Sequence, residues 1–282
     1  MTFQVIESLC LRGSAVMEDR MGWGENYLFV IDGASGLSDA HITPADSDAA
    51  WLAEGLRRSL HRLLPQEDLS LSQLLTLSAA GLKADYGKYW DRPDLPDYPS
   101  AGLALFRLRA GKLEYLGLGD CGAAVEFSDG TVTTMEETCL PALDRAALEQ
   151  MVKLCRETGC AMPEARKALN PVLIQNRNLR NHPEGYWIFD PSGAGVPHAR
   201  QASWPAEQVR AAALVSDGFA QLIDPFALAG DLPDLYRKMK DRGLADLAGT
   251  LFSLQQADPD CQNHPRFKFR DDTTALRATL TL

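Results

Sequence analysis

Residues 27–33 read YLFVIDG and place an aspartate and a glycine directly after five consecutive apolar residues. A short apolar run that ends in turn residues predicts a buried strand, and glycine permits a tight turn there. Two further segments repeat this arrangement, residues 113–120 (LEYLGLGD) and 211–218 (AAALVSDG). The pattern therefore predicts a carboxylate at the end of each of three buried strands, from Asp32, Asp120 and Asp217.

Two acidic pairs lie beside predicted strands as well. Glu18 and Asp19 occupy the turn before YLFVI, and Asp271 and Asp272 directly precede a closing strand over residues 273–282. Carboxylates that converge cannot all stay ionised without a compensating cation, and an all-oxygen ligand set favours Mg²⁺ or Mn²⁺. Each aspartate taken alone is more typical of an ordinary turn that bonds its own backbone. Spacing alone leaves these two interpretations close to even.

The remaining pattern predicts strands at both ends of the chain and helix pairs between them. Thr43-Pro44 and Ser70 are typical of helix starts, and a third helix is expected to begin near Asp144 and end at Gly159. Strands are expected at residues 3–10, 103–109, 113–118, 125–127, 131–133, 186–189 and 209–215. This order favours one α+β layered domain over a strict βαβ alternation.

Composition excludes several classes of function. The 282 residues are 45% hydrophobic and 23% charged, which is typical of a globular protein and not of a disordered or membrane protein. The net charge of -10 disfavours nucleic acid and anionic membranes as partners. Residues 1–13 lack the pattern of a secretory signal, and six scattered cysteines are typical of reduced thiols, so we expect a cytoplasmic protein.

Six short segments follow one another in a characteristic order: residues 17–20 (MEDR), 29–33 (FVIDG), 100–102 (SAG), 118–122 (LGDCG), 216–219 (SDGF) and 270–274 (RDDTT). In this order they resemble the motifs of the metal-dependent type 2C Ser/Thr protein phosphatases, the PPM family. The resemblance covers the chain from about residue 4 to its end. Each motif is short, but five or six in the right order are specific.

The resemblance implies a four-layer α-β-β-α sandwich, with two central, mostly antiparallel sheets flanked by helix pairs. It implies that residues 1–282 form a single phosphatase domain with a helical flap, or insert, at about residues 138–203. It also implies two Mn²⁺ or Mg²⁺ ions at one end of the sandwich, with a weaker third ion at Asp120.

The resemblance further assigns roles to single residues. Asp32 is implied to bridge both ions, and the backbone carbonyl of Gly33 to bind one. Asp217 and Asp271 are implied to complete the ligands of the second ion. Asp272 stands where the family usually has asparagine, and it is given an orienting role, with Asp271 as the ligand. Glu18 and Asp19 are implied to hold water ligands.

Two positions depart from the family pattern. Ala34 stands where eukaryotic members carry a general-acid histidine, and Ser14 stands where the phosphate-binding arginine usually lies. Arg12 and Arg20 are nearby candidates for binding substrate phosphate, because a guanidinium matches phosphate, but neither is in register with the motif and a solvated surface arginine is the favoured interpretation of each. In the flap, Arg166, Arg177, Arg180 and His182 are either substrate-recognition residues or a solvated helix face.

The resemblance implies an enzyme that hydrolyses phosphoserine and phosphothreonine on proteins, with a cognate Ser/Thr kinase as a further partner. A catalytically weak or inactive module that binds a phosphoprotein or kinase is the main alternative, because the histidine and the arginine are missing. A third interpretation keeps the metal chemistry and takes a small phosphorylated metabolite as substrate.

Overall fold

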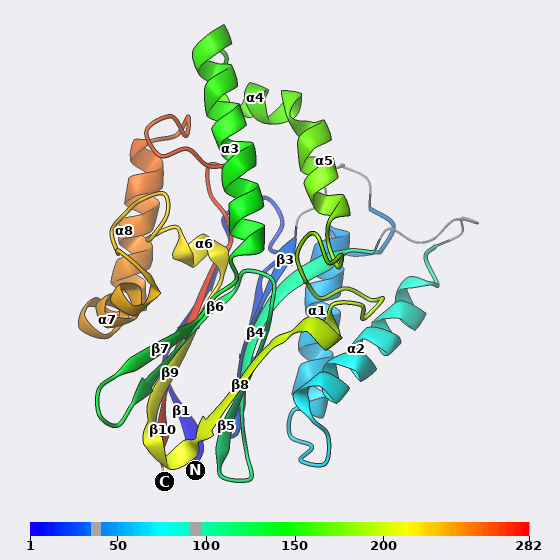
Figure 1. Cartoon of the computed structure of the whole chain (residues 1–282), viewed down its shortest axis with the longest axis vertical. Coiled ribbons are helices and arrows are strands. Elements are labelled where there is room, and N and C mark those ends of the chain that lie inside the picture. The colour runs from blue at the N-terminus through cyan, green and yellow to red at the C-terminus, as the bar shows by residue number, and fades with distance from the viewer. Residues whose placement is uncertain (35–40, 91–97, 282) are drawn as a thin grey trace.

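Two antiparallel sheets face each other in the computed structural model, which describes residues 1–34, 41–90 and 98–281 (Figure 1). Within these residues each sheet has five strands. The first, ordered β1-β10-β9-β6-β7, contains β1 (Thr2–Leu11), β6 (Gly122–Phe127), β7 (Val132–Met135), β9 (Val209–Val215) and β10 (Thr273–Thr281). The second, ordered β2-β3-β4-β5-β8, contains β2 (Arg20–Trp23), β3 (Tyr27–Ala34), β4 (Ser100–Arg109), β5 (Lys112–Leu118) and β8 (Arg200–Pro205). Leu282, the last residue of the expected closing strand, lies outside the described residues.

A helix pair covers the outer face of each sheet (Figure 1). Helices α1 (Asp48–Leu63) and α2 (Leu71–Tyr86) cover the second sheet, and α7 (Leu232–Arg242) and α8 (Leu244–Ala257) cover the first. The expected four-layer α-β-β-α sandwich is therefore confirmed. None of the described helices is both long enough and apolar enough to cross a membrane.

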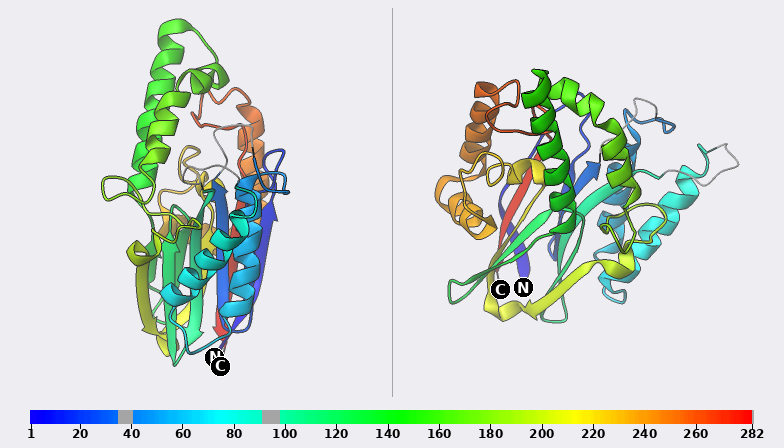
Figure 2. Two further views of the ribbon diagram at one scale, coloured as in Figure 1. Left: turned by 90° about the vertical axis from the view of Figure 1, so that its right-hand side faces the viewer. Right: turned by 45° about the horizontal axis from the view of Figure 1, so that its top comes forward.

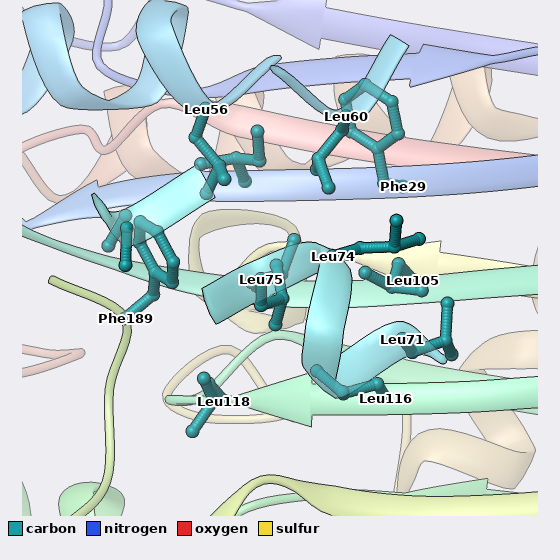
Figure 3. Close-up of a cluster of buried hydrophobic side chains, with 14 of the residues drawn as sticks. Phe29, Leu56, Leu60, Leu71, Leu74, Leu75, Leu105, Leu116, Leu118 and Phe189 are labelled. Carbon is teal, nitrogen blue, oxygen red and sulfur yellow. The ribbon is translucent and has the colours of Figure 1, made fainter. Parts of the chain in front are cut away.

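Strand β3 is apolar without interruption because both of its faces are covered. Leu28 and Val30 point into the core between the two sheets, whereas Phe29 and Ile31 point toward α1 and α2. Figure 3 shows the second of these clusters, in which Phe29 lies beside leucines of α1. Burying one such side chain contributes roughly 1.5–3 kcal/mol. This packing holds the end of β3, and with it Asp32, in a fixed place.

Helix α1 begins later than the sequence predicts. The expected start at Thr43-Pro44 is wrong, because Ser47 is the N-cap and its hydroxyl accepts a hydrogen bond from the backbone N–H of Ala50. The Asp48 carboxylate accepts from the backbone N–H of Thr43 at 2.9 Å, which keeps the preceding residues in a turn. The expected start at Ser70 is confirmed, with a capping box to Gln73 at the start of α2.

Helices α3 (Cys139–Thr158), α4 (Met162–Ala168) and α5 (Asn170–Asn178) stand over one end of the sandwich (Figures 1 and 2). Gly159 ends α3 in the left-handed conformation, as expected, with a φ of 76°. The expected start of α3 at Asp144 is wrong, because the helix begins at Cys139 and Asp144 lies within it. Residues 186–189 do not form the expected strand, because only Tyr186 and Phe189 make isolated bridges, to Arg180 and Ala101.

Candidate metal centre

The strand-end carboxylates meet under helices α3–α5. Asp32 ends β3 in one sheet, while Asp217 follows β9 and Asp271 precedes β10 in the other. Strands β9 and β10 are antiparallel neighbours, so the end of one lies beside the start of the next. With Asp120, which follows β5, these three residues line a cavity of about 180 Å³. The sequence pattern therefore identified side chains that the fold brings together.

The two sheets touch at this end through the predicted residues themselves. The backbone N–H of Asp217, the first residue of the short helix α6 (Asp217–Ala220), lies 3.4 Å from Oδ2 of Asp32. Gly33 packs against the acidic turn so closely that a Cβ there would lie 2.8 Å from the backbone oxygen of Glu18. Glycine is therefore required at this position for the approach of the two backbones.

Burial of several carboxylates in one place shifts their ionisation. Burial, and then the neighbouring carboxylates, raise the pKa of Asp19 to about 8, and the same two causes raise the pKa of Asp32 well above its usual value. Burial and Asp217 raise the pKa of Asp271 to about 6, although Lys268 opposes this. The pKa of Asp120 is raised well above its usual value for the same reasons, first burial and then the charge of neighbouring carboxylates. A bound cation would offset both the cost of burying the ionised carboxylates and the repulsion between them.

Asp271 and Asp272 have different surroundings. Asp272 is buried, and its Oδ1 accepts from the backbone N–H of Gly13 at 2.8 Å. Its Oδ2 accepts from the backbone N–H of Glu18 at 2.6 Å and of Asp19 at 3.3 Å. Asp272 thus holds the acidic turn in position, while Asp271 faces the cavity.

Glu18 is oriented by the start of a helix. Its Oε1 accepts a hydrogen bond of 2.6 Å from the hydroxyl of Ser47, the same hydroxyl that caps α1. The side chain of the acidic turn is therefore coupled to the helix layer outside the sheet.

The donor set fits a hard divalent cation. The candidate ligands around the cavity are carboxylates, which Mg²⁺ and Mn²⁺ prefer. Asp19 is only 1% exposed, and its Oδ2 has no hydrogen-bond partner within the described residues, as expected for an atom that serves another ligand. As their side chains lie, no three aspartate, glutamate, histidine or cysteine residues of the described chain are close enough to hold an ion.

The structure does not bring the two candidate phosphate-binding arginines to the cavity. Arg20 donates to Oε2 of Glu54 at 3.1 Å and to the backbone oxygen of Asp19 at 2.7 Å. Arg12 is exposed and donates to the backbone oxygen of Ala15 at 3.4 Å. Neither is among the described residues that line the cavity, whereas Ala34 is.

Sequence reasoning missed two charged residues at the site. Asp144 lines the cavity from α3, and burial together with Asp217 raises its pKa to about 6. Lys268 lines it from the loop before β10, with its ammonium 3.0 Å from Oδ1 of Asp271. Of the flap residues considered from the sequence, Arg166 and Arg177 line the cavity, whereas Arg180 donates to the backbone oxygen of Tyr98.

Comparison with known proteins gives a family for this arrangement. Residues 10–251 match the family model described as "Protein phosphatase 2C". None of the curated proteins compared with the chain matches its sequence.

Solved structures with a similar fold include bacterial serine/threonine phosphatases. The Mycobacterium tuberculosis phosphatase PstP is 16% identical, with 100% of each chain covered and a TM-score of 0.59. The catalytic domain of PstP in complex with two manganese ions is 16% identical, with 99% of this chain and 98% of that chain covered and a TM-score of 0.55. Stp1 from Staphylococcus aureus is 12% identical, with 100% and 96% covered and a TM-score of 0.55. At these identities the likeness establishes the fold.

Proposed function

The chain belongs to the protein phosphatase 2C family, and we propose that Asp32, Asp217 and Asp271 hold the metal ions of its reaction. As a member of this family it is a Mn²⁺- or Mg²⁺-dependent phosphatase that acts on phosphoserine and phosphothreonine in proteins. The observation that carries the residue assignment is the convergence of carboxylates from both sheets on one cavity, beside a buried Asp19 oxygen without a partner.

Each ligand role in the proposal is the one that the resemblance to the family implies for that motif position. Asp32 would be a ligand of both ions, and the backbone carbonyl of Gly33 would bind one of them. Asp217 and Asp271 would hold the second ion, and Asp120 would hold a third. Glu18 and Asp19 would hold water ligands, and the Ser47 hydroxyl keeps Glu18 oriented. When bound, the ions supply an activated water and offset the charge of the phosphoryl oxygens.

Substrate recognition is assigned to the flap, residues 138–203, as part of one phosphatase domain. Arg166 and Arg177 support this role because both line the cavity from α4 and α5. A guanidinium matches phosphate and carboxylate oxygens in pairs, which suits a phosphopeptide. The proposal also places the enzyme in the cytoplasm with a cognate Ser/Thr kinase, and the six free thiols, all in described residues, support a reducing compartment.

The test is hydrolysis of p-nitrophenyl phosphate by protein first stripped with EDTA, with and without added Mn²⁺. Turnover is expected only with Mn²⁺, and Asp32→Asn is expected to lower kcat more than a hundredfold, because it removes the bridging ligand. Asp129→Asn is the matched control, since Asp129 lies in the exposed turn between β6 and β7, with its carboxylate bonded to Thr131. Circular dichroism checks that both variants fold.

Full activity in Asp32→Asn would show that the ligand assignment is wrong. The alternative function, a non-catalytic module that binds a phosphoprotein or kinase, is favoured by one observation, the apolar Ala34 in the cavity wall. Calorimetric Mn²⁺ binding without turnover on p-nitrophenyl phosphate or on phosphopeptides would support that alternative.

A further inference from the structure

Lys268 places an ammonium group at the acidic cavity. Its Nζ is 3.0 Å from Oδ1 of Asp271, and its side chain is 30% exposed, so it contacts the carboxylate while remaining accessible. Lys268 lines both the 180 Å³ cavity and an adjoining groove of about 480 Å³ between α3 and α6. It therefore lies where a ligand passes from the groove to the carboxylates.

The charge of this ammonium is secured by its neighbours. A lysine side chain is ordinarily cationic at neutral pH, and the Asp271 carboxylate 3.0 Å away favours the charged form.

The loop that carries Lys268 is held rigidly by a buried ion pair. Arg266 donates to Oδ2 of Asp258 at 2.8 Å and to the backbone oxygen of Phe269 at 3.1 Å, so it binds the loop on both sides of Lys268. The side chains of Arg266 and Asp258 are both about 5% exposed or less. A cation on such a support is positioned in advance of ligand binding.

A phosphate dianion that approaches this cavity meets several carboxylates, which repel it. The metal ions offset part of this charge, and the protein must supply the rest from its own cations. Arg20 is bonded to Glu54, and Arg12 is exposed and directed to Ala15. Arg166 and Arg177 come from the flap wall, whereas Lys268 stands at the carboxylates themselves.

We propose that Lys268 contacts the phosphoryl oxygens of the substrate, and of the inorganic phosphate that hydrolysis releases. An ammonium carries three donors, so it can bridge a carboxylate of the site and a phosphoryl oxygen at once. This inference rests on the proposed phosphatase function and adds a residue to its substrate site. The competing role for Lys268 is that of a counter-ion, which neutralises Asp271 and has no contact with substrate.

The experiment measures phosphate binding directly. Inorganic phosphate is titrated into the Mn²⁺-loaded protein by calorimetry, and KM and kcat for p-nitrophenyl phosphate are measured in parallel. Lys268→Met is expected to weaken phosphate binding and raise KM by about tenfold, the size of one lost charge-assisted hydrogen bond. Lys268→Arg is expected to recover most of the affinity.

Lys240→Met serves as the matched control. Lys240, like Lys268, pairs with a carboxylate: its Nζ is 2.6 Å from Oε1 of the buried Glu126. Lys240 lies on α7, and neither Lys240 nor Glu126 is among the described residues that line the cavity. This variant is expected to bind phosphate as the original protein does. If Lys268→Met does not fold by circular dichroism, Lys268→Gln takes its place.

Unchanged phosphate affinity in the Lys268 variant, together with tighter Mn²⁺ binding in EDTA-stripped protein, would overturn the proposal in favour of the counter-ion role. Failure of the phosphatase function is separately visible, as absence of Mn²⁺-dependent turnover in the original protein. Phosphate calorimetry on the loaded protein tests Lys268 in either case.

Discussion

Two buried carboxylates of this protein differ in whether their oxygens are satisfied. Asp258 accepts hydrogen bonds on both oxygens, from backbone N–H groups of residues 262–264 and from the guanidinium of Arg266. Asp19 leaves Oδ2 without a hydrogen bond within the described residues. Burial raises the pKa of Asp258, but the backbone of Asn263 and the Arg266 side chain lower it to about 2, whereas burial raises the pKa of Asp19 to about 8.

Burial alone therefore does not distinguish a functional carboxylate from a structural one. Asp258 is as deeply buried as many core residues, and every bond that it makes stabilises one loop. Asp19 is held in place by its backbone, with one oxygen unsatisfied and other carboxylates nearby. An unsatisfied, repelled carboxylate in a fixed position is the kind of group that the proposed metal site requires.

The largest expected change in stability comes from substituting Asp258, the carboxylate whose oxygens are both hydrogen-bonded. Asp258→Asn leaves the guanidinium of Arg266 buried without its charge partner, so the free energy of unfolding is expected to fall by about 3–5 kcal/mol. Urea unfolding in the presence of Mn²⁺ measures this loss, with Asp129→Asn as an exposed control expected to change it by less than about 0.5 kcal/mol. A loss as small as that of the control would mean that the ion pair contributes little.

At Asp19, the carboxylate with an unsatisfied oxygen, the change in the free energy of unfolding is expected to have the opposite sign when no metal is bound. Asp19→Asn removes a carboxyl group whose pKa folding raises from 3.8 to about 8, so in EDTA at neutral pH the cost of that shift disappears and the free energy of unfolding is expected to rise by about 1–3 kcal/mol. In saturating Mn²⁺ the variant is expected to be the less stable protein, because it binds the ions more weakly. Urea unfolding under both conditions gives the two differences. Equal destabilisation under both conditions would remove the distinction between Asp19 and Asp258.

The smallest expected effect is in the pH dependence of stability. The folded pKa of Asp258, about 2, lies below its ordinary value of 3.8. The ionised Asp258 therefore contributes its full stabilisation when the pH is above the ordinary pKa of 3.8, and this stabilisation is lost as the pH falls toward the folded pKa of about 2. Between pH 5 and pH 3 the original protein is expected to lose about 1 kcal/mol more than Asp258→Asn. Parallel stability curves from urea unfolding at these pH values would contradict the lowered pKa.

The site could be predicted from the sequence where the signal is local. Asp32, Asp120 and Asp217 each follow a buried apolar run directly, and the end of a strand is a fixed place in a sandwich. The layer order could be predicted for the same reason, because strand and helix periods differ along the chain. The ligand roles of these residues stay predictions until metal binding is measured.

Other parts of the site depend on contacts that no local pattern records. Lys268 reaches the cavity because Arg266 and Asp258 fold their loop back on itself. Asp144 faces the cavity because α3 begins at Cys139, which turns a residue expected at the cap into the helix body. Arg20 forms an ion pair with Glu54, which is 34 positions away on α1, and this pairing directs the Arg20 side chain away from the cavity.

Strand β1 lies at an edge of its sheet and pairs with β10, the last strand along the chain. On a ribosome, roughly 260 residues must emerge between the two, which at about 5–20 residues per second takes roughly 13–50 s. Asp272 closes the acidic turn in the same final step, since it grips the backbone of Gly13 and Glu18. Strand β1 therefore stays without this partner until β10 has emerged, and a nascent chain that has not reached Asp272 lacks the contacts that hold the backbone of Gly13 and Glu18 in place.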